Sequence, residues 1–347
     1  MGKDKRSVLI IYTGGTIGMI KDPGGAYKPY SFQGLIDEVP ELSRFGFNLS
    51  SIEFEAPIDS SAVSPEIWIR LAGIIEDNYN SHDGFVILHG TDTMSYTASA
   101  LSFMLQGLSK PVILTGSQLP INMLRTDGRE NLISSIEIAA AKIKGKAAVP
   151  EVCIYFEFNL CRGNRTIKRS AEHFNAFESP NLPPLAEAGI TINYNTGIIR
   201  KNRIGSRLIV NSELDTNIVI FKIFPGMSRN VVDAVLNIPG LKGVVMETYG
   251  SGNAPLEPWF LRLLTDAVAK GIVIVNVTQC ISGNVVMERY STGVGLIKAG
   301  VISGADLTTE AAVTKLMVLF GKYRDSKSVV KYFQKDLAGE LTFSATR

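Results

Sequence analysis

Two threonines in this chain stand in glycine-containing turns that follow apolar runs. Thr16 lies in the segment Tyr12–Gly18 (YTGGTIG), and Thr91 lies in the segment His89–Thr93 (HGTDT). Glycines let the backbone turn sharply and expose amide N–H groups, so each hydroxyl is presented beside such groups. A threonine hydroxyl becomes an effective nucleophile when a neighbouring group takes its proton. Both threonines are therefore candidates for covalent chemistry.

Each turn also has a simpler explanation. The first loosely resembles a dinucleotide fingerprint, although the Gly-Lys-Ser/Thr sequence of a phosphate-binding loop is missing. Asp92 and Thr93 in the second turn are residue types favoured at helix N-termini. A third turn, Thr115–Gln118 (TGSQ), also follows an apolar run and adds Ser117 as a candidate. Ligands bind beyond the carboxyl ends of strands in open parallel sheets, so we expect the three turns to share one edge.

Several residues could assist the threonines. Tyr27, Lys168 and Asp92 are candidates for taking a proton, and lysine does so when burial or nearby charge lowers its pKa. Asp59 and Ser60 add a carboxylate and a hydroxyl on another loop. The alternatives are a solvated surface charge for Lys168 and a helix-leading turn for Asp59 and Ser60.

Strands and helices alternate along the chain. Most of the apolar runs lack polar alternation, which is typical of strands buried on both faces of a parallel sheet. Strands are expected at Ser7–Tyr12, Gly84–His89, Pro111–Thr115, Val152–Phe156, Asn217–Phe224, Lys242–Glu247 and Gly271–Val277. Helices are expected from Pro65 to about Tyr79 and at Met94–Leu105, Asp127–Lys144, Ser228–Leu236, Pro258–Ala269, Leu307–Phe320 and Ser326–Leu337. This order predicts an α/β protein.

The length of 347 residues favours two domains. We expect an N-terminal α/β domain with a parallel sheet over residues 1–190, which carries the threonines. A turn-rich, polar stretch over residues 191–212 is expected to link it to a smaller α/β domain over residues 213–347.

Composition excludes several classes of protein. Lys plus Arg is 35 and Asp plus Glu is 33, so the chain lacks the surplus of cations that a dedicated nucleic-acid binder needs. No apolar run is long enough to span a membrane, and the N-terminus fits no signal peptide. The three cysteines and three histidines show no zinc-ligand spacing, so we expect no metal site and a reducing, cytoplasmic location.

Taken together, these motifs resemble the L-asparaginases of the bacterial cytoplasmic type, over essentially the whole chain. The Thr-Gly-Gly-Thr turn and the segment His89–Thr93 are specific in combination, and the segments Arg162–Thr166 (RGNRT) and Ser179–Pro184 (SPNLPP) also look like that family. The resemblance implies an asparaginase-like fold. It also implies an amidohydrolase that converts L-asparagine to L-aspartate and ammonia by two-step acyl transfer, with no cofactor.

The resemblance also assigns roles to residues. It implies that Thr16 is the acylated nucleophile and that Tyr27 assists it. Thr91, Asp92 and Lys168 would form a hydrogen-bonded set that polarises the second hydroxyl. The remaining roles fall to substrate-binding residues: Asp59 and Ser60 would hold the α-amino and α-carboxylate groups, Asp92 would also bind the amine, and amides near Thr91 and Ser117 would face the amide oxygen.

Family members build each site between two subunits. The resemblance therefore implies a homodimer or homotetramer, and Asn253 matches the position that reaches across the interface. Some cytoplasmic-type relatives have a regulatory asparagine site with an arginine where Glu247 stands here. A carboxylate would repel the effector's carboxylate, so we expect that this chain does not keep that regulatory site, although Cys280 matches.

Three alternatives remain open at this point. An asparaginase-like subunit of an archaeal tRNA amidotransferase carries an extension before its Thr-Gly-Gly-Thr turn. In this sequence the corresponding turn begins at Thr13. An amino-acid sensor would keep Asp59, Ser60 and Asp92 but would need no activated threonine. A nucleotide-binding protein would need an acidic ribose-binding residue that the sequence does not supply at the required spacing.

Overall fold

The computed structural model describes residues 6–21, 27–29, 32–46, 48–201 and 207–342. The chain divides into two compact units, residues 1–210 and residues 211–347.

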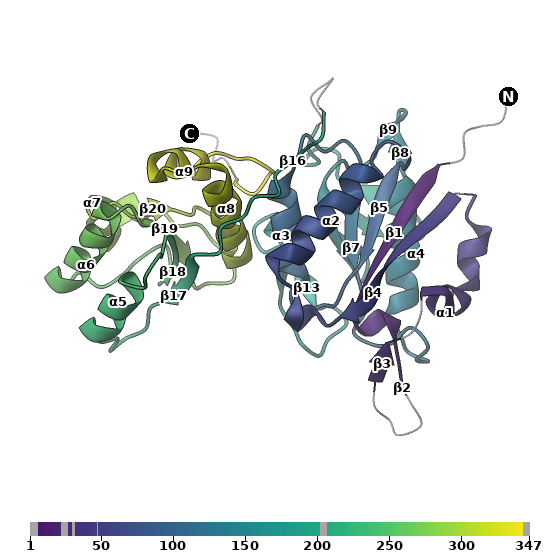
Figure 1. Cartoon of the computed structure of the whole chain (residues 1–347), viewed down its shortest axis with the longest axis horizontal. Coiled ribbons are helices and arrows are strands. Elements are labelled where there is room, and N and C mark those ends of the chain that lie inside the picture. The colour runs from purple at the N-terminus through teal and green to yellow at the C-terminus, as the bar shows by residue number, and fades with distance from the viewer. Residues whose placement is uncertain (1–5, 22–26, 30–31, 47, 202–206, 343–347) are drawn as a thin grey trace. The chain divides into compact units, whose positions relative to one another are not determined.

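A mixed sheet forms the centre of the first unit (Figure 1). In the described residues its strands follow the order β15 (Ile192–Tyr194), β14 (Ala186–Ala188), β11 (Asn159–Arg162), β10 (Val152–Phe156), β7 (Val112–Thr115), β5 (Gly84–Leu88), β1 (Ser7–Gly14) and β4 (Asn48–Ile58). The strands from β10 to β4 are parallel, whereas β11, β14 and β15 continue the sheet in antiparallel pairing. The predicted parallel sheet is therefore confirmed and is extended by a meander.

Burial explains why the central strands are continuous apolar runs. Every residue of β5, β7 and β10 is buried, because helices cover both faces of the sheet. One face packs on α4 (Gly128–Ala140) and α1 (Phe32–Asp37), and the other carries α3 (Met94–Met104), against which α2 (Pro65–Asp77) packs.

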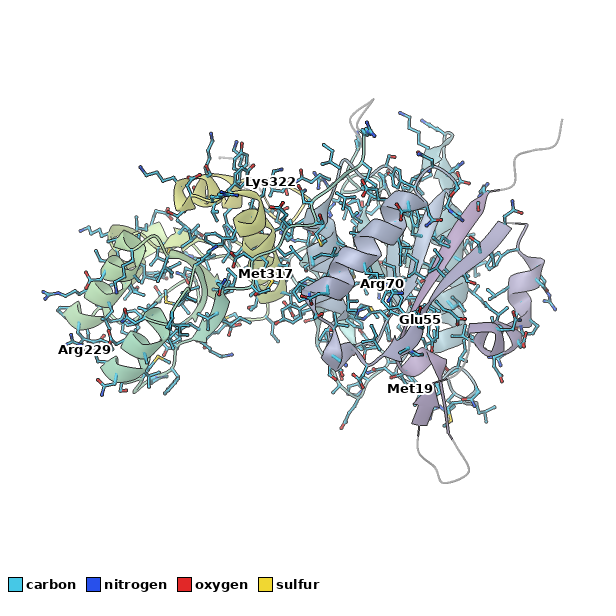
Figure 2. The ribbon with its side chains drawn as sticks, in the orientation of Figure 1. Met19, Glu55, Arg70, Arg229, Met317 and Lys322 are labelled. Carbon is cyan, nitrogen blue, oxygen red and sulfur yellow. The ribbon has the colours of Figure 1, made fainter. Side chains whose placement is uncertain are left out.

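The sequence signal was weaker at the sheet's rim, and β4 was not predicted. Most of its residues are polar or exposed, since it lies at the edge of the described sheet, where its partner strand is β1. The guanidinium carbon of Arg70 on α2 lies 3.9 Å from the ring centroid of Phe54 on β4. Figure 2 shows Arg70 close to this strand. The strand β15 lies within the stretch that was expected to link the domains, yet it pairs with β14 in this sheet.

Short elements complete the first unit. The two-stranded pairs are β2 (Met19–Lys21) with β3 (Tyr27–Pro29), β6 (Leu105–Gln106) with β16 (Ile209–Val210), β8 (Lys142–Ile143) with β9 (Lys146–Ala147), and β12 (Ile167–Lys168) with β13 (Phe177–Glu178). Single 3₁₀ turns occupy Thr16–Gly18, Pro40–Arg44, Ser60–Ala62 and Gly163–Arg165.

The second unit has a parallel sheet of four strands among its described residues. Their order is β17 (Ile218–Lys222), β18 (Gly243–Thr248), β19 (Val273–Thr278) and β20 (Ile302–Ser303). Its helices are α5 (Arg229–Leu236), α6 (Pro258–Ala269), α7 (Ser291–Lys298), α8 (Thr309–Lys322) and α9 (Ser326–Phe333), and Met287–Arg289 form a 3₁₀ turn. The expected smaller α/β domain is therefore confirmed. No helix in the described ranges is long and apolar enough to cross a membrane.

Candidate active site

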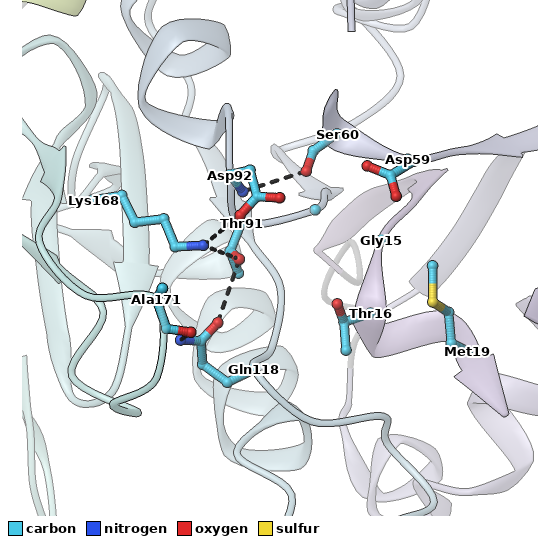
Figure 3. A pocket seen from close by; sticks show the side chains of 11 residues that line it. Gly15, Thr16, Met19, Asp59, Ser60, Thr91, Asp92, Gln118, Lys168 and Ala171 are labelled. Atoms are coloured by element: carbon cyan, nitrogen blue, oxygen red, sulfur yellow. Dashed lines mark hydrogen bonds and ion pairs between the residues drawn. The ribbon is translucent and has the colours of Figure 1, made fainter. Parts of the chain in front are cut away.

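A pocket of about 220 Å³ opens at the carboxyl edge of the first unit's sheet (Figure 3). The turns after β1, β5 and β7 contribute to it, together with the turn after β4 and the strand β12. Because β1, β5 and β7 are neighbours in the sheet, their three glycine turns meet there as expected. Its lining residues are Gly15, Thr16, Met19, Asp59, Ser60, Gly90, Thr91, Asp92, Gln118, Lys168 and Ala171.

Glycines allow these turns to touch through their backbones. Gly15 has a φ of 89°, and a Cβ on it would lie 2.5 Å from the Gly90 nitrogen. A Cβ on Gly90 would lie 2.6 Å from the Ser60 Oγ. Side chains at either glycine would therefore push apart the turns that carry Thr16, Thr91 and Ser60.

Thr91 belongs to a hydrogen-bonded network on one side of the pocket. Lys168 Nζ donates to Thr91 Oγ1 at 2.8 Å and pairs with Asp92 Oδ1 at 2.6 Å. The lysine side chain is mostly buried, with 16% of its surface exposed, whereas that of Asp92 is 64% exposed. Lys168 is thus no solvated surface charge, and the Asp92 carboxylate forms an ion pair with it. The N-cap residue of α3, Thr93, makes no side-chain hydrogen bond that caps this helix.

Gln118 completes this network. Thr91 Oγ1 donates to Gln118 Oε1 at 3.3 Å, and Gln118 Nε2 donates to the carbonyl oxygens of Ala171 at 3.3 Å and His173 at 3.0 Å. Since only the amide nitrogen can donate to carbonyls, these bonds turn the amide oxygen toward Thr91. We call Thr91, Asp92, Gln118 and Lys168 the Thr91 wall.

Thr16 lies on the opposite side of the pocket, beside Met19 (Figure 3). Within the described residues, its hydroxyl makes no hydrogen bond. It follows β1 directly, in the 3₁₀ turn Thr16–Gly18, where the Gly18 N–H donates to the Gly15 carbonyl at 3.1 Å. We call Thr16 and Met19 the Thr16 wall.

Asp59 and Ser60 form the rim between these walls (Figure 3). Asp59 Oδ1 accepts from the Ser61 N–H and from the Ser61 hydroxyl, each at 2.8 Å, and these bonds lower the pKa of the Asp59 carboxyl. The interpretation of Asp59 as part of a turn also applies, since its side chain caps the 3₁₀ turn Ser60–Ala62. Ser60 is buried, and its Oγ accepts from the Asp92 N–H at 3.3 Å.

His89 lies just behind the Thr91 turn. It is 1% exposed, its Nδ1 lies 2.7 Å from the Gly90 carbonyl oxygen, and its Nε2 lies 3.0 Å from Thr97 Oγ1. The Trp68 Nε1–H donates to the same threonine hydroxyl at 3.0 Å. Burial lowers the pKa of His89 from 6.5 to about 4, so the ring is neutral at ordinary pH.

Among the described side chains, those of Ser117 and Asn253 are not part of this pocket's lining. The backbone of Tyr27 starts β3, but its side chain lies outside the described part of the structure. The Ser117 side chain is buried and donates to the Leu119 carbonyl at 2.5 Å, while the neighbouring Gln118 lines the pocket. Asn253 belongs to the second unit, where its Oδ1 accepts from Thr292 Oγ1 at 2.6 Å.

Sequence reasoning missed the contributions of Gln118, Met19 and Ala171. Gln118 was part of the third turn, but only a chain trace shows that it, and not Ser117, points into the pocket. Met19 follows Thr16 by three residues, and Ala171 follows Lys168 by three. Neither residue type carries a chemical signal of its own.

A second, mostly apolar pocket surrounds Asn253 in the second unit. It has a volume of about 570 Å³, and its lining includes Phe224, Tyr249, Trp259 and Thr292. The Phe224 side chain is 55% exposed. Across the described ranges of both units, no group of three or more His, Cys, Asp or Glu side chains is placed to hold a metal ion.

Comparison with known proteins agrees with this architecture. Residues 7–200 match the family described as "Asparaginase, N-terminal", and residues 217–333 match "Glutaminase/Asparaginase C-terminal domain". The chain is 46% identical to "L-asparaginase 1" of Escherichia coli strain K12 over 342 residues, covering 97% of this chain and 98% of that protein.

Solved structures agree as well. The crystal structure of L-asparaginase I from Vibrio cholerae has a TM-score of 0.88 and 40% identity, covering 98% of this chain and all of that one. The probable cytoplasmic L-asparaginase from Campylobacter jejuni has a TM-score of 0.79 and 27% identity, covering 96% and 100%. This chain belongs to the asparaginase family and has the asparaginase-like fold.

Proposed function

We propose that this protein is an L-asparagine amidohydrolase that forms an acyl-enzyme on Thr16. The observation that carries the proposal is the pairing of two threonine hydroxyls across one polar pocket, one held by a lysine and the other without a hydrogen-bond partner in the described residues. An oxygen whose lone pairs are not occupied by donors is the better nucleophile. Thr16 therefore attacks, and Thr91 assists.

The rim and the Thr91 wall suit a small zwitterion. The carboxylates of Asp59 and Asp92 supply negative charge for an α-ammonium group. The Ser60 hydroxyl accepts from the Asp92 N–H, so its own proton is available to an α-carboxylate. The alternative of an amino-acid sensor explains these two subsites but gives no reason for the bond between Lys168 and Thr91.

The reaction then proceeds in two steps. The Thr16 Oγ bonds to the side-chain carbonyl carbon, the C–N bond breaks, and the nitrogen leaves as ammonia after taking the proton that Thr16 loses. Water next adds to the ester carbon, and the Thr16 oxygen leaves with a proton, which releases L-aspartate. In both steps the oxyanion needs N–H donors, and the Thr91 backbone N–H has no other partner in the described structure. Tyr27 assists at Thr16, and the backbone near Ser117 faces the amide group.

Ammonia release tests this proposal. Wild-type protein should hydrolyse L-asparagine without added metal or cofactor, and Thr16→Ala or Thr91→Val should each lower kcat by about three orders of magnitude or more. Binding of asparagine without any ammonia would favour the sensor instead. L-glutamine and D-asparagine assayed alongside measure the selectivity.

We also propose that the active protein is a cytoplasmic homodimer or homotetramer, in which Asn253 of one copy completes the site of another. The apolar pocket around Asn253 and the exposed Phe224 support this, because contiguous apolar surface is typical of interfaces. Mixing Thr16→Ala subunits with Asn253→Ala subunits should restore activity, since one site in each mixed pair is then intact. Mixtures without restored activity, or a monomer in light scattering, would contradict this assembly.

A further inference from the structure

We propose that His89 is a positioning residue, which fixes the Gly90–Thr91 peptide so that the Thr91 N–H faces the pocket as an oxyanion donor. The inference rests on the proposed amidohydrolase function. It assigns a task to a buried side chain that does not line the pocket but contacts the backbone of Gly90, which does.

The hydrogen bonds of His89 fix its tautomer. A carbonyl oxygen can only accept, so the Nδ1 that faces the Gly90 oxygen at 2.7 Å must carry the proton. The neutral ring then has its lone pair on Nε2, which accepts from the Thr97 hydroxyl at 3.0 Å. The Thr97 oxygen in turn accepts from the Trp68 Nε1–H. In this series of hydrogen bonds, each donor therefore points in the direction from Trp68 toward Gly90.

The fixed carbonyl determines where the next N–H points. The Gly90 C=O and the Thr91 N–H belong to one peptide unit, and in a trans peptide they point in opposite directions. No cis peptide occurs among the described residues. Because His89 holds the carbonyl on the buried side, the Thr91 N–H is directed away from the ring, toward the pocket that Gly90 and Thr91 line. This N–H makes no hydrogen bond within the described structure.

Two helices hold the residues of this hydrogen-bond series in place. Thr97 lies on α3 and Trp68 on α2, and both helices pack on the same side of the sheet. Gly90 has no side chain that could hold its peptide, and a Cβ there would clash with Ser60. Because Gly90 has no side chain, the residue itself does not restrain the Gly90–Thr91 peptide, and the hydrogen bond from His89 does so.

A matched pair of variants separates positioning from packing. The Nδ2 of His89→Asn can occupy the place of Nδ1 and donate to the Gly90 oxygen. The Oε1 of His89→Gln can instead take the place of the imidazole Nε2 and accept from the Thr97 hydroxyl, which leaves the Gly90 oxygen without its donor. We expect His89→Asn to keep kcat for L-asparagine within about threefold. We expect His89→Gln to lose about 10- to 100-fold in kcat with little change in KM, because an oxyanion donor acts mainly in the transition state.

Thermal unfolding of both variants is the control for packing. Equal kcat losses in the two variants, or a wild-type kcat in His89→Gln, would overturn the proposal. The proposal would also be overturned if the kcat losses followed the thermal midpoints of the variants and did not depend on whether residue 89 can donate to the Gly90 oxygen.

The tautomer is measured independently of activity. The chain has three histidines, so ¹⁵N-histidine labelling gives a simple spectrum in which the His89 signals are identified by their loss in His89→Gln. The expected state at neutral pH is the Nδ1–H tautomer, and an Nε2–H tautomer would overturn the proposal. Failure of the proposed function is distinguishable: wild-type protein would release no ammonia although the ring showed the Nδ1–H tautomer, and the oxyanion role would then be withdrawn.

Discussion

The two walls of the pocket hold their hydroxyls in opposite ways. On the Thr91 wall the oxygen receives a hydrogen bond from Lys168 and gives one to Gln118, and the loop behind it is fixed through Ala171 and His173. On the Thr16 wall the described structure shows no hydrogen bond to the hydroxyl. One wall is therefore organised before substrate arrives, and the other presents a hydroxyl that substrate can approach.

This difference suggests how one residue type can do two tasks. A threonine that is held by a cation and an amide keeps a fixed proton direction, which suits proton transfer. A threonine without such partners keeps its lone pairs for attack on carbon. Changes to either wall or to its supports should therefore affect catalysis and stability to different degrees.

Removing the cation should collapse the organisation of the Thr91 wall. We expect Lys168→Met to lower kcat by about 10² to 10³, equivalent to about 3–4 kcal/mol, because Thr91 and Asp92 lose their shared donor. Steady-state ammonia release measures this, with circular dichroism as the check on folding. A Lys168→Met enzyme within tenfold of wild type would show that the held hydroxyl is not needed.

The neutral histidine behind this wall should make stability depend on pH. Its pKa is about 4 in the folded protein and 6.5 when unfolded, so the neutral ring stabilises the fold above pH 6.5 and this contribution disappears as the pH falls toward 4. The total is about 3 kcal/mol. Between pH 7.5 and pH 5, the thermal midpoint of wild type should fall by roughly 4–8 °C more than that of His89→Asn. Parallel pH curves for the two proteins would contradict a buried, neutral ring.

Gln118 offers a milder test of the same wall. Gln118→Leu keeps the side chain's approximate size but removes the acceptor for the Thr91 proton and both bonds to the loop of Ala171 and His173. Each neutral hydrogen bond contributes about 1 kcal/mol, so we expect kcat to fall about tenfold. Gln118→Glu restores the acceptor but not the two donors. If both variants match wild type, the proton direction of Thr91 is set elsewhere.

The smallest effect should come from the rim. Ser61→Ala removes one of the two hydrogen bonds that orient Asp59 and lower its pKa, while the backbone bond remains. We expect KM for L-asparagine to rise about two- to threefold at pH 7, with kcat unchanged. The rise should be larger in acid, because Asp59 is then protonated at a higher pH. A change in kcat with constant KM would argue against a substrate-binding role for Asp59.

Much of the site was predictable because its residues carry local chemical signals. The glycine turns with Thr16 and Thr91 follow the buried apolar runs of β1 and β5. Ligands bind at the carboxyl ends of strands in open parallel sheets, and these two strands are neighbours. The role of Lys168 was predictable mainly because the chain's motifs resemble a known family, since a lysine near a turn is usually a surface charge.

Other parts depended on tertiary structure that periodicity does not report. The edge strand β4 alternates weakly because, among the described strands, none pairs with its outer side. The choice between Ser117 and Gln118 depends on a single backbone turn, in which Gln118 N–H donates to the carboxylate of Asp127, nine residues away. The role of His89 depends on Trp68 and Thr97, which are distant in sequence and carry no shared motif.

The assignment of attack to Thr16 is tested most directly by finding the acyl group. Wild-type protein and Lys168→Met would be quenched in acid during turnover of L-asparagine, digested, and analysed by mass spectrometry. We predict an aspartyl ester on the peptide that contains Thr16, enriched in Lys168→Met if water attack is slowed more than acylation. An aspartyl ester on the peptide that contains Thr91 would contradict the account.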